Sequence, residues 1–190
     1  MPAEGLVWLD RSEVLTFEEI ERVARILVER FNIDSIRLTG GEPTVRAHLP
    51  LLIEKLASLR LASGEKPDIA LTTNGATLRN IAGELREAGL DRINVSLDSL
   101  IPERFAEMTR RDELANVLAG ITEAQAAGFS PVKVNAVIER GVNDDEILAL
   151  ATYGRDNGVE VRFIEFMPLD ATNEWQRNHK SSCRSRPVAD

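Results

Sequence analysis

The sequence of 190 residues contains only one cysteine, Cys183. A single thiol cannot form a disulfide framework, and it cannot supply the several thiolates that a zinc site or an iron–sulfur cluster needs. We interpret Cys183 as an exposed thiol in a terminal tail. The sequence therefore predicts no metal site built from these residues alone.

Positive charge is also scarce. Lys and Arg together number 23 against 31 Asp and Glu, so the formal net charge is −8. Proteins that bind nucleic acid use a basic surface to neutralise phosphates. The balance argues against general nucleic-acid binding, but it leaves room for a local basic pocket that binds a small anion.

Long hydrophobic runs are missing as well. No apolar stretch approaches the roughly 18 residues that a membrane-spanning helix needs. The first five residues, MPAEG, have neither the basic nor the apolar stretch of a secretory signal. We expect a cytoplasmic protein that does not contact the membrane.

What the sequence does contain is a regular alternation of helix and strand patterns. A capping box at Thr16 and Glu19 announces the first helix. Further helices are expected over 48–59, 77–88, 102–127 (in two pieces) and 144–157, and strands over 35–39, 68–73, 92–97, 131–138 and 159–167. This α(βα)₄β order predicts a parallel sheet with right-handed crossovers. Because a barrel-like sheet should begin with a strand, we expect that one strand is missing upstream.

The predicted strands alternate between apolar and polar side chains, although parallel strands covered on both faces are usually apolar throughout. One face of the sheet should therefore be polar, as in a wet lumen that holds a polar ligand. A sheet with one solvent-exposed side is the alternative. The polar side chains expected on this face are Arg37, Thr39, Thr72, Asn74, Asn94, Ser96, Asp98, Lys133, Asn135 and Glu165, and Met167 shares the face with Glu165.

Two features of this face indicate a ligand. Arg37 and Lys133 are cations inside an acidic protein, and buried cations need partners. Those partners are either the carboxylates of Asp98 and Glu165 or an anionic ligand such as a triphosphate or a carboxylate. Gly40-Gly41 at a strand end lets the backbone turn sharply or approach a ligand, although a glycine pair alone more often marks a turn.

Six sequence blocks then carry a resemblance. They are LTGGEP at 38–43, LTTNG at 71–75, NVSLDS at 94–99, VKVN at 132–135, GVNDDE at 141–146 and RFIEFMPL at 162–169. In order and spacing these blocks resemble the GTP 3′,8-cyclase family of molybdenum cofactor biosynthesis, within the radical S-adenosylmethionine superfamily.

The resemblance implies an α/β fold, the incomplete (β/α)₆ partial barrel, here lacking its first strand. It implies S-adenosylmethionine and [4Fe–4S] clusters as cofactors and GTP as substrate, which a 5′-deoxyadenosyl radical converts toward cyclic pyranopterin monophosphate. It further implies a possible homodimer of the full-length protein. Residues implied to contact S-adenosylmethionine are Gly40, Gly41, Glu42, Pro43, Ser96 and Met167; those implied to contact GTP are Arg37, Thr72 and Lys133.

The sequence also departs from the family. The CxxxCxxC motif that binds the first cluster, the first strand and an upstream arginine are absent, and three cysteines of a C-terminal region are not matched. We therefore expect a partial-barrel core over 1–177 and a disordered tail over 178–190 that is foreign to the family. As it stands the chain is expected to be an inactive cyclase. The alternatives are a decayed fragment or weak nucleotide-binding module, and a radical enzyme with a peptide substrate.

Overall fold

The computed structural model describes residues 13–167. The helices are α1 Phe17–Phe31, α2 Leu49–Ala57, α3 Leu78–Glu87, α4 Pro102–Thr109, α5 Leu114–Ala126 and α6 Ile147–Asn157, with short 3₁₀ turns η2 Pro43–Val45 and η3 Asp144–Glu146. The strands are β1 Ser35–Leu38, β2 Asp68–Thr73, β3 Arg92–Ser96, β4 Lys133–Ile138 and β5 Glu160–Glu165. The expectations for Cys183 and for the tail over 178–190 lie outside the described residues.

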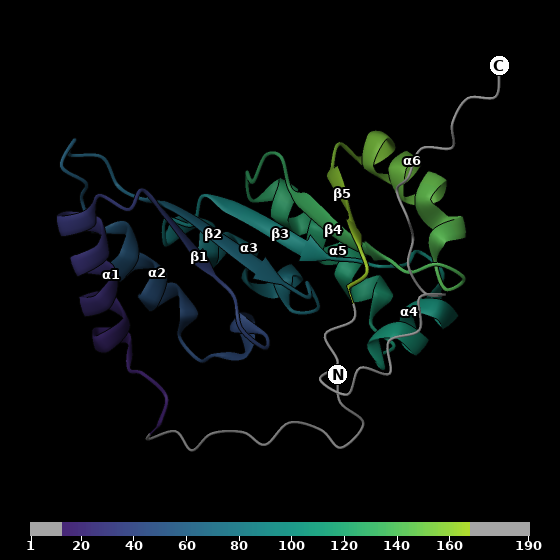
Figure 1. Cartoon of the computed structure of the whole chain (residues 1–190), viewed down its shortest axis with the longest axis horizontal. Coiled ribbons are helices and arrows are strands. Elements are labelled where there is room, and N and C mark those ends of the chain that lie inside the picture. The colour runs from purple at the N-terminus through teal and green to yellow at the C-terminus, as the bar shows by residue number, and fades with distance from the viewer. Residues whose placement is uncertain (1–12, 168–190) are drawn as a thin grey trace.

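The five strands form one sheet in the order β1-β2-β3-β4-β5, and every neighbouring pair is parallel (Figure 1). Strands that follow one another in the chain are thus also neighbours in space, joined by helical crossovers. The predicted α/β class and α(βα)₄β order are confirmed for residues 13–167.

Helix α1 shows how the sequence sets these elements. The Thr16 hydroxyl accepts a hydrogen bond from the Glu19 N–H at 3.2 Å, and the Thr16 N–H donates to the Glu19 carboxylate at 2.8 Å. This predicted capping box satisfies two backbone donors that have no partner inside the helix. The helix ends at Asn32, which adopts the left-handed conformation with φ 52°.

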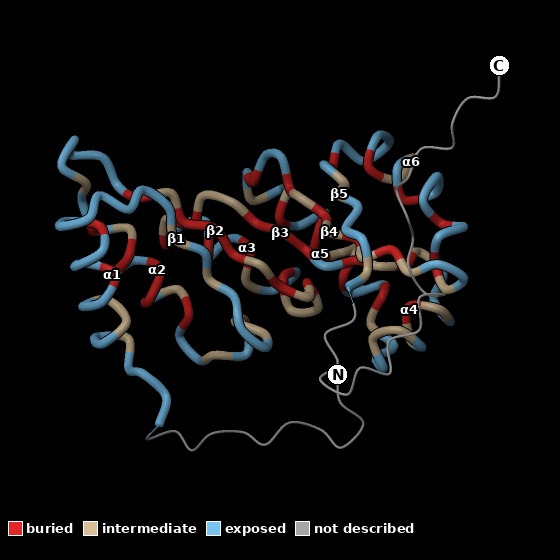
Figure 2. Tube along the Cα trace, viewed as in Figure 1, coloured by how far each residue is buried: buried red, intermediate tan, exposed pale blue. Residues whose placement is uncertain are grey.

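The hydrophobic core lies between one face of the sheet and the helices. Figure 2 shows the buried residues concentrated along the middle strands and the helix faces next to them. Leu71, Val95 and Val134 of the three central strands are fully buried there. They pack in one cluster with residues of α1, α2, α3 and α5, so these helices cover the apolar face. The other side of the sheet is called the polar face below.

The strand register arranges the polar face in rows, because residues paired in a parallel register point to the same side of the sheet. The first row is Arg37, Ala70 and Arg92; the second is Thr72, Asn94, Lys133 and Glu160; the third is Ser96, Asn135 and Arg162. The predicted polar positions on β1 to β4 thus share one face.

The prediction that Glu165 of β5 lies on the polar face is wrong. Glu165 is paired with Ile138, whose side chain belongs to the buried side, whereas Arg162 is paired with Asn135 of the polar face. Glu165 therefore lies on the helix side of the sheet. The strand is an edge strand with exposed residues on both faces, so its polarity pattern alone did not specify which side faces the core.

Candidate functional site

The glycine-rich loop after β1 leaves open space at the end of the sheet. Gly40 has φ 148°, and a Cβ added there would have no heavy atom within 4 Å. Backbone conformation, rather than crowding, favours glycine at this position. Gly40 and Gly41 are both exposed, so a ligand can reach this stretch of backbone.

Glu42 ties the glycine-rich loop to the end of β2. Its Oε1 accepts hydrogen bonds from the Thr44 N–H at 3.0 Å, the Thr44 hydroxyl at 2.7 Å and the Thr73 hydroxyl at 2.7 Å. Its Oε2 accepts from the Asn74 N–H at 2.7 Å. The carboxylate thus holds the loop in place from within the protein, and Pro43 begins the 3₁₀ turn that follows. The predicted contacts of Glu42 and Pro43 with S-adenosylmethionine stay predictions.

The turn after β2 is tightly packed. Gly75 has φ 80°, and a Cβ there would lie 2.7 Å from Cγ1 of Val95. The Gly75 N–H donates to the Thr73 hydroxyl at 3.1 Å, and the Ala76 N–H donates to Oδ1 of Asn74 at 3.0 Å. These bonds fix the position at which β2 ends beside the glycine-rich loop.

Two residues in the middle of the polar face carry buried polar groups whose hydrogen bonds are poor or missing. Among residues 13–167, Thr72 Oγ1 is the buried side-chain polar atom without a hydrogen-bond partner. Asn94 is 3% exposed, and its Nδ2 donates to the Leu71 carbonyl oxygen at a long 3.4 Å. Thr72 was predicted as a substrate contact, whereas Asn94 was predicted only to line the face.

Two cations of the polar face, Lys133 and Arg162, share the carboxylate of Glu160. Lys133 Nζ lies 3.8 Å from Glu160 Oε2, and Arg162 Nε donates to Glu160 Oε1 at 2.8 Å. The Arg162 hydrogen bond and, to a lesser extent, the Lys133 charge lower the pKa of Glu160. The alternative in which Lys133 pairs with Asp98 or Glu165 is therefore wrong, because Glu160 is the carboxylate beside it in register.

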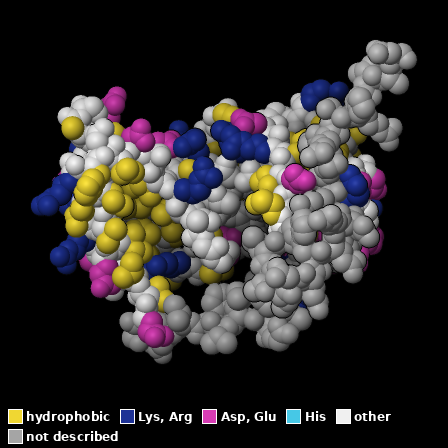
Figure 3. All heavy atoms as spheres, in the orientation of Figure 1, with side chains coloured by type: hydrophobic (Ala, Val, Ile, Leu, Met, Phe, Trp, Pro, Cys, Tyr) yellow, Lys and Arg dark blue, Asp and Glu magenta, His cyan; other side chains and the backbone are white. Residues whose placement is uncertain are grey.

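Arg37 stands differently from the other arginine in its row. Arg92 forms an ion pair with Asp68, including Nε to Oδ1 at 2.9 Å. Arg37 is exposed and has no ion pair within the described part of the chain. Figure 3 shows Lys and Arg side chains gathered over the middle strands of this acidic protein. An anion that lies on the polar face can therefore reach a cation that is not neutralised.

A buried polar cluster, which the sequence did not predict, connects the carboxyl ends of β3 and β4 by hydrogen bonds. The Asn143 amide donates to the carbonyl oxygens of Asp98 at 2.7 Å and Val137 at 2.8 Å. Glu146 is 3% exposed and accepts from the Ser99 hydroxyl and the Leu100 N–H, each at 2.7 Å. The helix predicted over 144–157 begins later than expected, because Asp144–Glu146 forms a 3₁₀ turn and the α-helix starts at Ile147.

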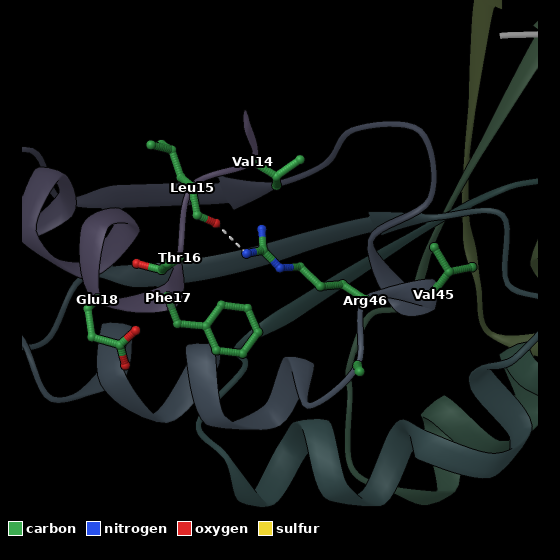
Figure 4. Close-up of a pocket in the computed structure, with 8 residues that line it drawn as sticks. Val14, Leu15, Thr16, Phe17, Glu18, Val45 and Arg46 are labelled. Carbon is green, nitrogen blue, oxygen red and sulfur yellow. Dashed lines mark hydrogen bonds between the residues drawn. The ribbon is translucent and has the colours of Figure 1, made fainter. Parts of the chain in front are cut away.

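A cavity of about 550 Å³ lies elsewhere, beside the start of α1 (Figure 4). The Arg46 guanidinium stacks 4.6 Å from the centre of the Phe17 ring and donates to the Leu15 carbonyl oxygen. The cavity is lined by Val14, Leu15, Thr16, Phe17, Glu18, Val45, Arg46 and Ala47. None of the predicted site residues lines it.

The predicted cofactor contacts fit one implied group and not the other. Gly41 and Ser96 are exposed at the carboxyl ends of β1 and β3, and Met167, two residues beyond β5, is 70% exposed. These positions are open to a ligand the size of S-adenosylmethionine. A [4Fe–4S] cluster does not fit, because residues 13–167 hold no group of three potential metal ligands and the sequence has one cysteine. No helix within 13–167 is both long and apolar enough to cross a membrane.

Comparisons with known proteins agree with this arrangement. The Radical SAM superfamily profile matches residues 7–153. The chain is 51% identical over 178 residues to a GTP 3′,8-cyclase of Corynebacterium glutamicum, covering 93% of this chain and 47% of that protein. It is 47% identical over 177 residues to the GTP 3′,8-cyclase of Streptomyces coelicolor, covering 93% of this chain and 51% of that protein. The chain thus spans about half the length of the curated relatives it matches.

Solved structures show the same fold at lower sequence identity. The crystal structure of HydG, a maturase of the [FeFe]-hydrogenase, superposes with a TM-score of 0.60 at 17% identity, over 80% of this chain and 36% of that one. Methylornithine synthase (PylB) superposes with a TM-score of 0.56 at 20% identity, over 81% of this chain and 45% of that one.

Proposed function

Because the chain belongs to the Radical SAM superfamily, we propose that it is the part of a GTP 3′,8-cyclase that holds GTP and S-adenosylmethionine in molybdenum cofactor biosynthesis. We propose further that its parallel sheet is a segment of an incomplete (β/α)₆ barrel, with the polar face turned inward. The observation that supports this most strongly is the 47–51% identity to named GTP 3′,8-cyclases over 93% of the chain.

The positions of the predicted GTP contacts support the proposal. Thr72 and Lys133 occupy the same row of the polar face, and Arg37 occupies the row next to it. Lys133 is held by Glu160, a partner that also pairs with Arg162. The phosphates of GTP would meet Arg37 and Lys133, and the Thr72 hydroxyl would gain the hydrogen bond that it lacks.

The predicted cofactor contacts lie closer to the carboxyl ends of the strands than the predicted GTP contacts do. Ser96 lies one row closer to the carboxyl ends than Thr72 and Lys133, and the glycine-rich loop follows β1. Parallel barrels bind ligands at these strand ends. S-adenosylmethionine, when bound there, supplies the 5′-deoxyadenosyl group. These residues do not fit the iron–sulfur cluster, so the role assigned to this chain is to bind and orient the two small molecules.

Titration calorimetry of GTP against the chain tests this proposal. We expect saturable binding that weakens by at least about tenfold in an Arg37→Ala/Lys133→Ala variant, because each charge-assisted hydrogen bond contributes about 1.5–3 kcal/mol. The matched control is Arg22→Ala/Arg79→Ala, which removes two cations that are exposed on helices α1 and α3. Absence of GTP binding by the parent chain, or an equal loss in both double variants, would contradict the proposal.

A further inference from the structure

On the polar face, the two middle strands β2 and β3 carry short side chains at four positions, which are called the floor below. Ala70 and Thr72 belong to β2, and Asn94 and Ser96 to β3, all on this face. The flanking strands carry the long cations Arg37, Lys133 and Arg162. Since neighbouring strands lie about 4.8 Å apart, a ligand over Thr72, Asn94 and Ser96 has cations on both sides and short, uncharged groups beneath it, whereas Arg92 at the start of β3 is paired with Asp68.

Asn94 differs from the other floor residues because its side chain is buried and makes few of the hydrogen bonds that an amide can form. An amide side chain can donate two hydrogen bonds and accept two. Asn94 is 3% exposed, yet within residues 13–167 it makes the single 3.4 Å contact with the Leu71 carbonyl oxygen. That distance lies beyond the usual 2.7–3.2 Å range of protein hydrogen bonds.

The neighbouring group in the same row has the same deficiency. Thr72 is paired with Asn94 in the register, and its buried Oγ1 has no partner in the described structure. A buried polar group without a hydrogen bond destabilises the fold. Two such groups lie side by side on the face that holds Arg37, a cation without an ion pair among residues 13–167. Their arrangement indicates that a ligand completes the missing hydrogen bonds.

We propose that Asn94 is a further substrate-binding residue, which together with Thr72 binds the neutral, nucleoside part of the nucleotide. The inference rests on the proposed function. The cations on either side attract the phosphates, whereas an amide and a hydroxyl suit uncharged partners such as a ribose hydroxyl or the edge of a base. Asn94 would therefore contribute to recognising a nucleoside, and not to binding phosphate.

Calorimetric titrations with GTP and with inorganic triphosphate separate these two roles. We expect Asn94→Ala to weaken GTP binding by about tenfold, the effect of one or two lost hydrogen bonds, and to leave triphosphate binding unchanged within about twofold. Asn94→Leu keeps most of the side-chain volume, so it tests the same loss of polar groups without a cavity. The control Asn80→Ala removes an exposed amide from α3 and should change neither titration.

Each outcome is decisive. If the parent chain does not bind GTP, the proposed function fails together with this inference. If the parent binds GTP and both Asn94 variants bind it within about twofold of the parent, the inference alone is wrong. Parallel losses for GTP and triphosphate would also overturn it, since Asn94 would then act only through the shape of the site. Melting temperatures identify a variant that does not fold. In that case the GTP titration of the other Asn94 variant tests whether Asn94 binds the nucleoside.

Discussion

At the level of single residues, the second row of the polar face carries polar atoms that the folded chain leaves without good partners. Thr72 and Asn94 occupy β2 and β3 in that row, next to Lys133 of β4. Burial of such groups without hydrogen bonds opposes folding. Because these groups lie beside cations, a nucleotide bound there can supply the hydrogen bonds that they lack.

Thr72→Val should stabilise the chain and weaken GTP binding at the same time. Valine has a similar shape but lacks the unpartnered hydroxyl, so the free energy of unfolding should rise by about 1 kcal/mol. Urea denaturation measures this change, and the GTP titration measures the loss of affinity. The adjacent Thr73→Val is the matched control, because that hydroxyl bonds to Glu42 and the Gly75 N–H. It should lower stability by about 1–3 kcal/mol; equal effects of the two substitutions would contradict this explanation.

Asp98 should make stability depend on pH in a defined direction. Burial raises the pKa of its carboxyl above the ordinary value of 3.8, although the Val137 N–H that donates to it acts in the opposite direction. The folded state therefore favours the protonated form. The contribution of Asp98 to stability falls as pH rises from near 3.8 through the raised folded pKa, and the loss is complete above it.

Urea unfolding of the parent and Asp98→Asn across this pH range isolates the effect. Asparagine keeps an oxygen for the Val137 N–H but does not titrate, and the other groups cancel in the difference between the two proteins. We expect the parent to lose stability relative to the variant as pH rises. A difference that stays constant, or that changes in the opposite direction, would show that burial does not govern this carboxyl.

At the level of elements, the sequence predicted most boundaries because local signals agree with the tertiary structure. The strand over 68–73 is found at Asp68–Thr73, and the capping box at Thr16 and Glu19 is formed. Alternation placed the polar residues of β1 to β4 on one face, since those strands have one side fixed in the core.

The misses have physical causes. The sequence misplaced Glu165 because β5 is exposed on both sides. It missed the roles of Asn143 and Glu146 because their partners, Asp98 and Ser99, are more than 40 positions away in the chain. An acidic turn near a helix start suggests a favourable dipole interaction, whereas the structure uses Glu146 for buried long-range hydrogen bonds.

Glu146→Ala should disconnect the start of α6 from the end of β3. The carboxylate side chain is 4% exposed and pairs with Arg104 at 2.7 Å in addition to Ser99 and Leu100. Its removal leaves buried donors without an acceptor, so the free energy of unfolding should fall by about 3–5 kcal/mol. The neighbour Asp145 pairs with the same arginine but is 64% exposed, so Asp145→Ala should cost less than about 1 kcal/mol. Urea denaturation measures both changes. If the two variants lose similar free energies of unfolding, the buried hydrogen bonds of Glu146 do not stabilise the fold as described.

At the level of the whole molecule, one edge of the described structure combines an open strand with an apolar surface. Strand β1 ends the sheet order and pairs only with β2 among residues 13–167. On α1, Val23, Leu27 and Phe31 are 51%, 43% and 68% exposed, and Figure 3 shows hydrophobic side chains gathered on this side of the molecule. Open strand edges and large apolar patches promote association.

We therefore expect the chain to self-associate through this edge. Sedimentation velocity should show oligomers that grow with concentration, and Phe31→Lys should shift the distribution toward the monomer. Leu148→Lys is the matched control, because Leu148 is 78% exposed on α6, away from the edge. A monomeric parent, or an equal effect of both substitutions, would contradict this prediction.

If the proposal is right, the polar face of the sheet is a nucleotide-binding surface within an acidic protein. NMR spectra of the ¹⁵N-labelled chain, recorded while GTP is added, test it most directly. We expect saturable shifts at the amides of Arg37, Thr72, Asn94 and Lys133, with little change along the outer faces of α3 and α5. Shifts confined to the helices, or spectra that do not change with GTP, would contradict it.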